Sequence, residues 1–292
     1  MNLRHKLRGR IRQSYYLSKA RYEILYHRRV LRDQEPIVIF QGGKVGSTTI
    51  AESLRRLNLG NPIYHVHFIN GVDRRHKRMV NEFKLTHREY FARSKHFLVG
   101  QYLQREIKRG LEDKKWKVIT LVRNPFEQRI SSFFQIVDLI VPDFQERCLR
   151  QEISAEELAA LFMRHMRPRA TSSDWFDYQM APVFGIDVFA HSFPTHQGYQ
   201  IYHGERADLL LMRLEDLDRS AARAFKEFLG INEFSLVRRN IAATKHYAAV
   251  YKEFKKTIIL PEPYIDAICA DKGARHFYTA EELDQFRATY HH

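Results

Sequence analysis

Residues 36–54 constrain the fold more than any other part of this chain. The run Pro-Ile-Val-Ile-Phe at 36–40 is short, apolar and β-branched, which is typical of a buried strand. A Gln-Gly-Gly sequence follows it, and residues 48–54 then show the apolar spacing of a helix. The segment therefore predicts a strand, a glycine turn and a helix in that order, with the ordered domain beginning at Pro36.

The rest of the chain repeats this alternation of strand and helix patterns. Alternation on this scale favours a three-layer α/β architecture, in which helices cover both faces of a mostly parallel central sheet. An antiparallel excursion is expected near 186–202, with a turn near His196–Gly198. The remaining strand-like runs lie at 63–68, 97–100, 118–122 and 209–212, and helical patterns lie at 73–93, 101–113, 125–138, 154–166 and 218–229.

The net charge is concentrated near the N-terminus. The 292 residues include 48 Lys and Arg against 34 Asp and Glu, which gives a net charge of +14. Residues 1–35 contain ten basic and three acidic residues, and so carry half of that excess. A basic balance indicates an anionic partner, such as nucleic acid, anionic lipid or a small polyanion. Two interpretations of residues 1–35 are open: a basic helix or arm, docked or solvated, and a peripheral anchor on an anionic membrane surface.

Composition narrows the class of protein further. Hydrophobic residues make up 44% of the chain, with only 13 Gly and 9 Pro, which excludes collagen-like, low-complexity and wholly disordered chains. No apolar run approaches a membrane span, and no apolar region follows the basic start, so a secretory signal is not expected. Cys148 and Cys269 lie far apart in the sequence and form neither a disulfide framework nor a metal motif, so we expect both to be reduced thiols. We expect a single domain over 36–292, located in the cytoplasm or at the inner membrane surface.

The expected glycine turn has the features of an anion-binding loop. Its backbone N–H groups can converge on an anion, and the start of the following helix adds partial positive charge. Lys44 precedes Gly46 and no lysine follows it, so the loop departs from the nucleotide-triphosphatase pattern G-x-x-x-x-G-K-[ST]. The alternative is a structural glycine turn with an N-capping hydroxyl. The residues expected to surround the anion are Gly43, Lys44, Val45, Gly46, Ser47, Thr48 and Thr49.

A second candidate binding element follows the predicted strand at 118–122. Arg123 stands at the carboxyl end of that strand, where ligands bind in open α/β sheets, and Pro125 is well placed to begin the next helix. Ser131 lies about two helical turns further on and can face the same crevice. An arginine fork and a hydroxyl can together hold one phosphate. The alternative is a solvated arginine with a serine on a helix surface.

Together the two elements resemble those of the phosphosulfate-dependent sulfotransferases. That family combines a P/G-K-x-G-[ST]-[ST] loop after the first strand with R-[DN]-P and a serine eight residues after the arginine. Residues 43–48 and 123–131 match both patterns, in order. The resemblance implies a P-loop-like sulfotransferase fold that binds 3′-phosphoadenylyl sulfate (PAPS) and releases adenosine 3′,5′-bisphosphate (PAP), without a metal. It places the 5′-phosphosulfate at the first element and the 3′-phosphate at the second.

Later residues narrow the resemblance. The sequence Arg-Leu-Glu-Asp-Leu at 213–217 is similar to the R-x-E-D-L of many sulfotransferases, although a core strand followed by a capped helix explains it equally. Residues 175–177, 185–188 and 240–255 are similar to the bacterial capsular polysaccharide synthesis group. Many carbohydrate-acting sulfotransferases have a further arginine where this chain has Gln128, and the role of the neighbouring Arg129 stays open.

Two histidines are candidates for a general base. Period-two alternation over 63–68 puts His65 and His67 on one face of a strand. If that strand neighbours the first, a neutral His67 would lie beside the anion loop and could accept a proton from an attacking hydroxyl. Two structural histidines are the alternative. Gln101 stands where some carbohydrate sulfotransferases have a catalytic histidine. We expect substrate contacts from His65, Gln101 and Lys245, and no metal site.

These patterns predict transfer of a sulfuryl group from PAPS to a hydroxyl of a saccharide or polysaccharide acceptor. Lys44 would neutralise charge on the leaving phosphate, since positioning and charge stabilisation dominate such transfers. Two alternatives stay open. A nucleotide-dependent phosphoryl transferase would need Mg²⁺ and a carboxylate to hold it. A basic, non-catalytic module would bind glycan or nucleic acid, whereas the sulfotransferase interpretation predicts no nucleic-acid partner.

Overall fold

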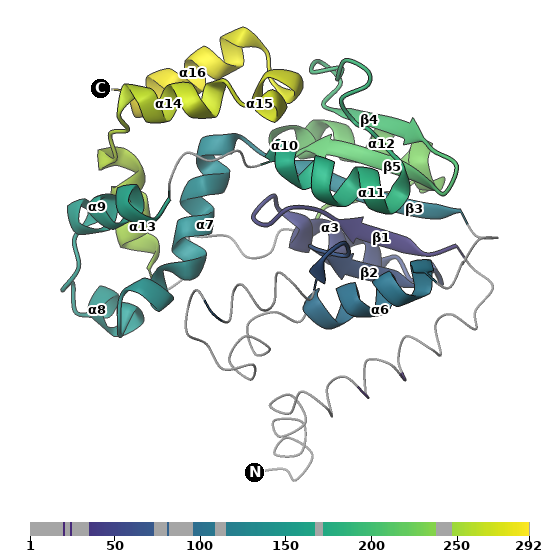
Figure 1. Ribbon diagram of the computed structural model, residues 1–292, viewed down its shortest axis with the longest axis horizontal. Coiled ribbons are helices and arrows are strands. Elements are labelled where there is room, and N and C mark those ends of the chain that lie inside the picture. The colour runs from purple at the N-terminus through teal and green to yellow at the C-terminus, as the bar shows by residue number, and fades with distance from the viewer. Residues whose placement is uncertain are drawn as a thin grey trace.

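A five-stranded sheet in the order β2-β1-β3-β5-β4 forms the centre of the computed structural model (Figure 1). The structure describes residues 20, 24, 35–72, 81, 96–108, 115–166, 172–237 and 247–291. β2, β1, β3 and β5 are parallel, and β4 runs antiparallel to β5, which confirms the prediction of a mostly parallel sheet. The strands are β1 (Ile37–Phe40), β2 (Ile63–Val66), β3 (Trp116–Val122), β4 (Tyr199–His203) and β5 (Ala207–Arg213).

Helices cover both faces of this sheet. Successive side chains of a strand point to opposite faces, so Ile37 and Ile39 pack in one apolar cluster while Val38 and Phe40 pack in another. The first cluster includes buried residues of α3 (Ser47–Arg56) and α12 (Leu217–Leu229). The second includes α6 (His96–Lys108), the π-helical turn η1 (Phe176–Met180) and α11 (Ala181–Phe184), with α10 (Ser172–Trp175) before them. The three-layer prediction is confirmed.

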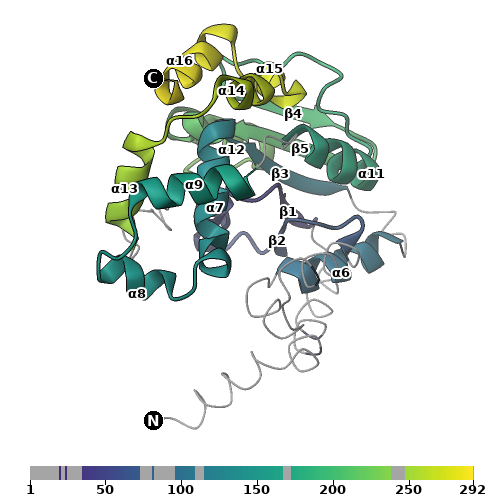
Figure 2. The same ribbon diagram turned by 60° about the vertical axis from the view of Figure 1, so that its left-hand side comes forward.

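A third apolar cluster lies beyond the end of the sheet. α7 (Pro125–Ile140) follows β3 and lies beside α9 (Ala155–His165) and α13 (Ala248–Thr257) (Figure 2). Aromatic side chains of these three helices pack together in this cluster. Phe133 and Phe254 stack with their ring centroids 6.0 Å apart. The same cluster takes in Phe144 of α8 (Phe144–Leu149) and residues of α14 (Glu262–Cys269). After α14, α15 (Lys272–Phe277) and α16 (Ala280–Tyr290) complete the chain (Figure 1).

Two local predictions need correction. Residues 97–100, predicted as a strand, belong to α6, because a short apolar run has no periodicity that separates a strand from a buried helix. Gly100 allows this helix to approach the chain after β2, since a Cβ there would lie 2.2 Å from the Phe68 carbonyl oxygen. Within 186–202 only the last residues are extended, as the start of β4. The turn before them is present, with Gly198 N–H donating to the Pro194 carbonyl.

Other predictions fall on parts of the chain that the structure does not describe. These are the basic segment 1–35, apart from residues 20, 24 and 35, and the helix predicted at 73–93, apart from residue 81. Among the described residues, no helix is both long and apolar enough to cross a membrane.

Candidate functional site

The glycine loop joins the carboxyl end of β1 to the first turn of α3, as the sequence predicts. Lys44 and Gly46 both have left-handed backbone conformations, with φ of 70° and 86°. Glycine suits this position because residues with a Cβ rarely adopt such a φ, and a Cβ here would also lie 2.5 Å from Cδ1 of Leu214. α3 begins at Ser47 and has no acidic residue in its first turn. The amino end of α3 therefore meets the loop with its positive dipole end, an arrangement that favours an anion.

Arg123 and the glycine loop lie together at one edge of the sheet. β3 is the parallel neighbour of β1, so the carboxyl ends of both strands reach the same edge. Nη1 of Arg123 donates to the Lys44 carbonyl at 3.2 Å, and Nε2 of Gln128 donates to the Gly43 carbonyl at 2.8 Å. The two elements recognised separately in the sequence are therefore in direct contact.

The turn that carries Arg123 is held by capping bonds. The Asn124 side chain accepts hydrogen bonds from the N–H groups of Phe126 and Glu127 at the start of α7. The backbone N–H of Asn124 donates to the Glu215 carboxylate at 2.7 Å, and the Tyr278 hydroxyl donates to the same carboxylate at 3.1 Å. Burial of Glu215 raises its pKa in spite of these bonds. Glu215 of the R-x-E-D-L sequence therefore helps to position the turn that carries Arg123.

The arginine of that sequence has a structural role. Arg213 is buried at the end of β5, and its guanidinium donates to both carboxylate oxygens of Glu282, at 2.9 and 2.7 Å. It also pairs with Asp216. Burial opposes the charge of Arg213, but the bonds to these two carboxylates outweigh it and raise its pKa. The ion pair between Arg213 and Glu282 connects β5 to α16, which supports the structural interpretation of residues 213–217.

Glu127 is an acidic residue of the site that the sequence did not single out. Its carboxylate accepts from Nη2 of Arg123 at 3.1 Å, from Nζ of Lys255 at 2.5 Å and from the Tyr290 hydroxyl at 2.9 Å. Ser131 lies one helical turn after Glu127 on the same side of α7, and Arg123 precedes this helix, next to its N-cap Asn124. Glu127 thus holds two cationic groups beside the loop, and any anion at Arg123 must share that arginine with it.

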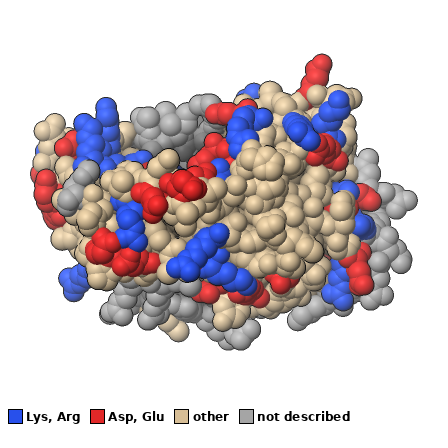
Figure 3. All heavy atoms as spheres, turned by 90° about the horizontal axis from the view of Figure 1, so that it is seen from above, with Lys and Arg blue, Asp and Glu red and all other residues tan. Residues whose placement is uncertain are grey.

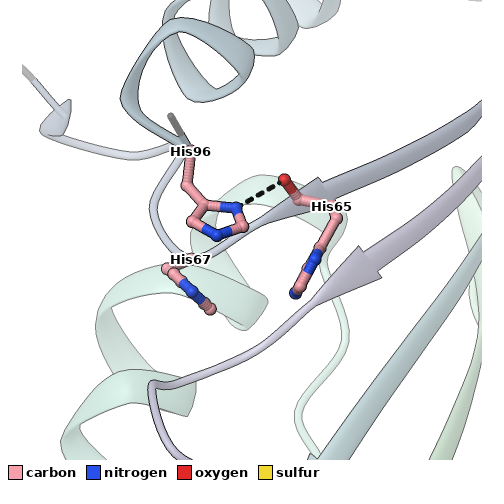
Figure 4. A group of neighbouring side chains, drawn as sticks. All are labelled: His65, His67 and His96. Atoms are coloured by element: carbon pink, nitrogen blue, oxygen red, sulfur yellow. Dashed lines mark hydrogen bonds between the residues drawn. The ribbon is translucent and has the colours of Figure 1, made fainter. Parts of the chain in front are cut away.

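Three imidazole rings gather beside the start of α3 (Figure 4). His65 comes from β2, His67 follows that strand directly, and His96 begins α6. Ring centroids are 4.2 Å apart for His67 and His96, 4.5 Å for His65 and His96, and 5.4 Å for His65 and His67. β2 is the parallel neighbour of β1, so the expectation that His67 lies beside the glycine loop is met. His96 is an addition that the sequence did not reveal.

Hydrogen bonds connect this histidine cluster to the loop. Nε2 of His65 lies 2.7 Å from the Ser47 hydroxyl, and Nδ1 of His67 lies 3.1 Å from the Gln41 carbonyl. Trp175 donates from its indole to the His67 carbonyl at 2.9 Å and so fixes the backbone there. Burial, helped by the neighbouring His96 and His67, lowers the pKa of His65 to about 2. His65 is therefore a neutral ring at physiological pH.

Three other residues named from the sequence have different outcomes. Gln101 stands in the second turn of α6 and not at the end of a strand, because its predicted strand is helical. Lys245 lies outside the described residues. Arg129 is buried with its guanidinium 5.9 Å from the Tyr264 ring centroid, and burial lowers its pKa. At the loop, the contact from this part of α7 comes from Gln128 instead.

The fold and the site define an α/β protein with a glycine loop, an arginine and a histidine cluster at the carboxyl edge of a parallel sheet. A family model described as "Putative capsular polysaccharide synthesis protein" matches residues 155–279. That match covers β4, β5 and the R-x-E-D-L sequence. The glycine loop and Arg123 precede its first residue and lie outside it. Neither the curated proteins nor the solved structures compared with this chain contain a match.

Proposed function

We propose that this protein transfers a sulfuryl group from PAPS to a hydroxyl of a saccharide or polysaccharide precursor. The observation that carries the proposal is the contact between the two phosphate-binding elements. Arg123 reaches the Lys44 carbonyl and Gln128 reaches the Gly43 carbonyl, so one bisphosphorylated nucleotide can touch both elements at once. Its 5′-phosphosulfate would bind at the loop and its 3′-phosphate at Arg123 and Ser131.

The loop supplies the charge stabilisation that the transfer needs. The attacking hydroxyl oxygen forms a bond to sulfur while the bond from sulfur to the bridging 5′-phosphate oxygen breaks, and PAP leaves. Lys44 neutralises the charge that grows on this bridging oxygen. The N–H groups of residues 43–49 and the hydroxyls of Ser47, Thr48 and Thr49 hold the 5′-phosphate. The donor is thereby positioned before the reaction, which lowers the entropic part of the barrier.

His67 is the residue proposed to accept the proton of the acceptor hydroxyl. The Gln41 carbonyl can only accept a hydrogen bond, so Nδ1 of His67 carries the proton at this contact. The lone pair of the neutral ring is then on Nε2, which makes that atom the base. His65, hydrogen-bonded to Ser47, connects the same cluster to the 5′-phosphate loop.

The saccharide acceptor is supported by the match to the capsular polysaccharide family over residues 155–279. A role in polysaccharide biosynthesis is the coarser conclusion that this match suggests by itself. The chemistry of the transfer rests instead on the loop and Arg123, which lie outside the matched segment.

Charge on the molecular surface bears on the competing interpretation of a basic binding module. On the face that includes the C-terminal helices, acidic and basic side chains are interspersed (Figure 3). Arg287 there pairs with Glu262 and Asp266. A polyanion-binding face would instead gather basic side chains in one patch or stripe. This face therefore offers no support for nucleic-acid binding.

Calorimetry with three ligands separates the candidate functions. The full chain, kept in a chelator, is titrated with PAP, with ATP and with a short oligonucleotide, and ATP is repeated with Mg²⁺. We expect PAP to bind tightly, and ATP and the oligonucleotide to bind weakly or not at all. Binding of ATP only with Mg²⁺ would indicate a phosphoryl transferase, and preferred binding of the oligonucleotide would indicate a nucleic-acid module. Either of these results would refute the proposal.

A further inference from the structure

Although the sequence led us to expect no metal site, we infer that His65, His67 and His96 form a binding site for a divalent transition-metal ion, with Zn²⁺ as the expected cation. One ring nitrogen from each histidine lies within 4.8 Å of the other two, and all three rings are partly buried. In Figure 4 the three rings face a common space. Among the parts of the chain that the structure describes, this is the one group of three or more such side chains close enough to hold an ion.

The backbone orients two of the three rings as metal ligands are usually oriented. Nδ1 of His96 donates to the His65 carbonyl at 2.9 Å, and Nδ1 of His67 donates to the Gln41 carbonyl at 3.1 Å. A carbonyl accepts only, so each neutral ring keeps its lone pair on Nε2. A metal-binding histidine commonly uses one nitrogen for the ion and gives the other N–H to such an outer partner. His67 and His96 therefore have the required tautomer before any ion arrives.

The donor set selects the class of cation. Three neutral imidazoles suit Zn²⁺ and its neighbours in the first transition series, whereas Mg²⁺ and Ca²⁺ require oxygen ligands. Zinc–nitrogen bonds of about 2.0–2.1 Å put the nitrogens of a tetrahedral site roughly 3.4 Å apart. The three ring nitrogens now lie within 4.8 Å of one another. Side-chain rotations that move each nitrogen by about an ångström would bring them to the zinc-binding separation. Three protein ligands leave a fourth position for water or a ligand oxygen, as in catalytic zinc sites.

The metal site and the proposed base use the same atom. An ion held by Nε2 of His67 occupies the lone pair that would accept the proton of the acceptor hydroxyl. Metal binding therefore excludes the base role of His67 while it lasts. The inference itself does not depend on the proposed reaction, since it rests on the geometry of the three rings and their outer partners.

Cobalt titration tests the site directly. The full chain is freed of metal and carries His291→Ala and His292→Ala, which removes the adjacent C-terminal histidines as competing ligands. Co²⁺ is added, and the visible absorption of four-coordinate cobalt is followed; Zn²⁺ is then added in competition. We expect one Co²⁺ bound per chain and its displacement by Zn²⁺. Absence of saturable binding by this parent protein would overturn the inference without any further variant.

Variants connect the binding to the three rings. His96→Ala should weaken Zn²⁺ affinity by at least the roughly 10–100-fold that changes to outer-shell partners cost. His191→Ala changes an exposed histidine in another part of the fold and should have no effect. Zn²⁺ should also raise the melting temperature of the parent protein and not that of His96→Ala. Equal affinity in the parent and in a folded His96→Ala protein would refute the assignment.

A loop variant separates this inference from the proposed function. Lys44→Ala should lower sulfuryl transfer and leave Co²⁺ binding unchanged, because Lys44 is not one of the three ligands. PAP binding measured in a chelator tests the nucleotide site without the metal. The two proposals can therefore fail independently.

Discussion

Replacing Gly46 by alanine tests the backbone conformation of the glycine loop. Gly46 has φ of 86°, a conformation that costs a residue with a Cβ about 1–2 kcal/mol. The new methyl group would also lie 2.5 Å from Cδ1 of Leu214, and because Leu214 is half-buried and its side chain can shift, this overpacking costs about 1 kcal/mol. Gly46→Ala should therefore lower the free energy of unfolding by about 2–3 kcal/mol, a sizeable part of the roughly 5–15 kcal/mol of a typical protein.

Two further variants separate the strain from the clash. Gly43 lies in the same loop without a positive φ, and a Cβ there meets nothing within 4 Å, so Gly43→Ala is the matched control and should be nearly neutral for stability. In a Leu214→Ala background the clashing atom is gone. Gly46→Ala should then cost only the strain of about 1–2 kcal/mol.

Urea unfolding followed by circular dichroism is measured for the wild type, Gly46→Ala, Gly43→Ala, Leu214→Ala and the double variant of Gly46→Ala with Leu214→Ala. The midpoint should fall for Gly46→Ala with the slope unchanged, which indicates a loss of stability without a change in compactness. If Gly46→Ala unfolds at the same urea concentration as Gly43→Ala, the conformation assigned to this loop is wrong. If the Leu214→Ala background makes no difference to the cost, the clash is not part of the explanation.

Three other outcomes follow from particular contacts. Burial of Asp208 opposes its ionisation, but hydrogen bonds from Lys115, Lys117 and His203 outweigh burial and lower the pKa of this carboxyl. The wild type should therefore lose stability as the pH falls below about 4, and Asp208→Asn should show less of this loss in melting curves between pH 2 and pH 7. Glu127→Gln removes the negative charge that competes with the 3′-phosphate for Arg123, so PAP affinity measured by calorimetry should rise about threefold. A decrease in PAP affinity would contradict this competition. Zn²⁺ should inhibit sulfuryl transfer while PAP still binds, and activation by Zn²⁺ would contradict the exclusive use of one histidine nitrogen.

Local signals in the sequence were enough to predict the loop and the strands beside it. A β-branched run, a pair of glycines and a helix with helical spacing specify their own geometry, and β1, the loop and α3 are present as predicted. The parallel sheet also followed from the alternation of elements. The order of strands did not, and it is this order that brings His67 to the loop through the pairing of β2 with β1.

His96 and Glu127 show what local signals miss. His96 lies 31 positions from His65, and it begins a helix whose first apolar residues were predicted as a strand. Glu127 meets Lys255 and Tyr290 only because α13 and α16 return to the start of α7. Both are consequences of long-range packing, for which neither spacing nor periodicity carries a signal.

Binding of PAP and of adenosine 5′-phosphate by the wild type and by Arg123→Ala tests the central claim most directly. The two ligands differ only in the 3′-phosphate, and the two proteins differ only in the group proposed to hold it. A hydrogen bond to a charged partner is worth about 1.5–3 kcal/mol, so the wild type should prefer PAP by roughly 10- to 100-fold. Arg123→Ala should remove most of that preference and leave the affinity for adenosine 5′-phosphate nearly unchanged. Equal affinity of the wild type for both ligands would contradict the account.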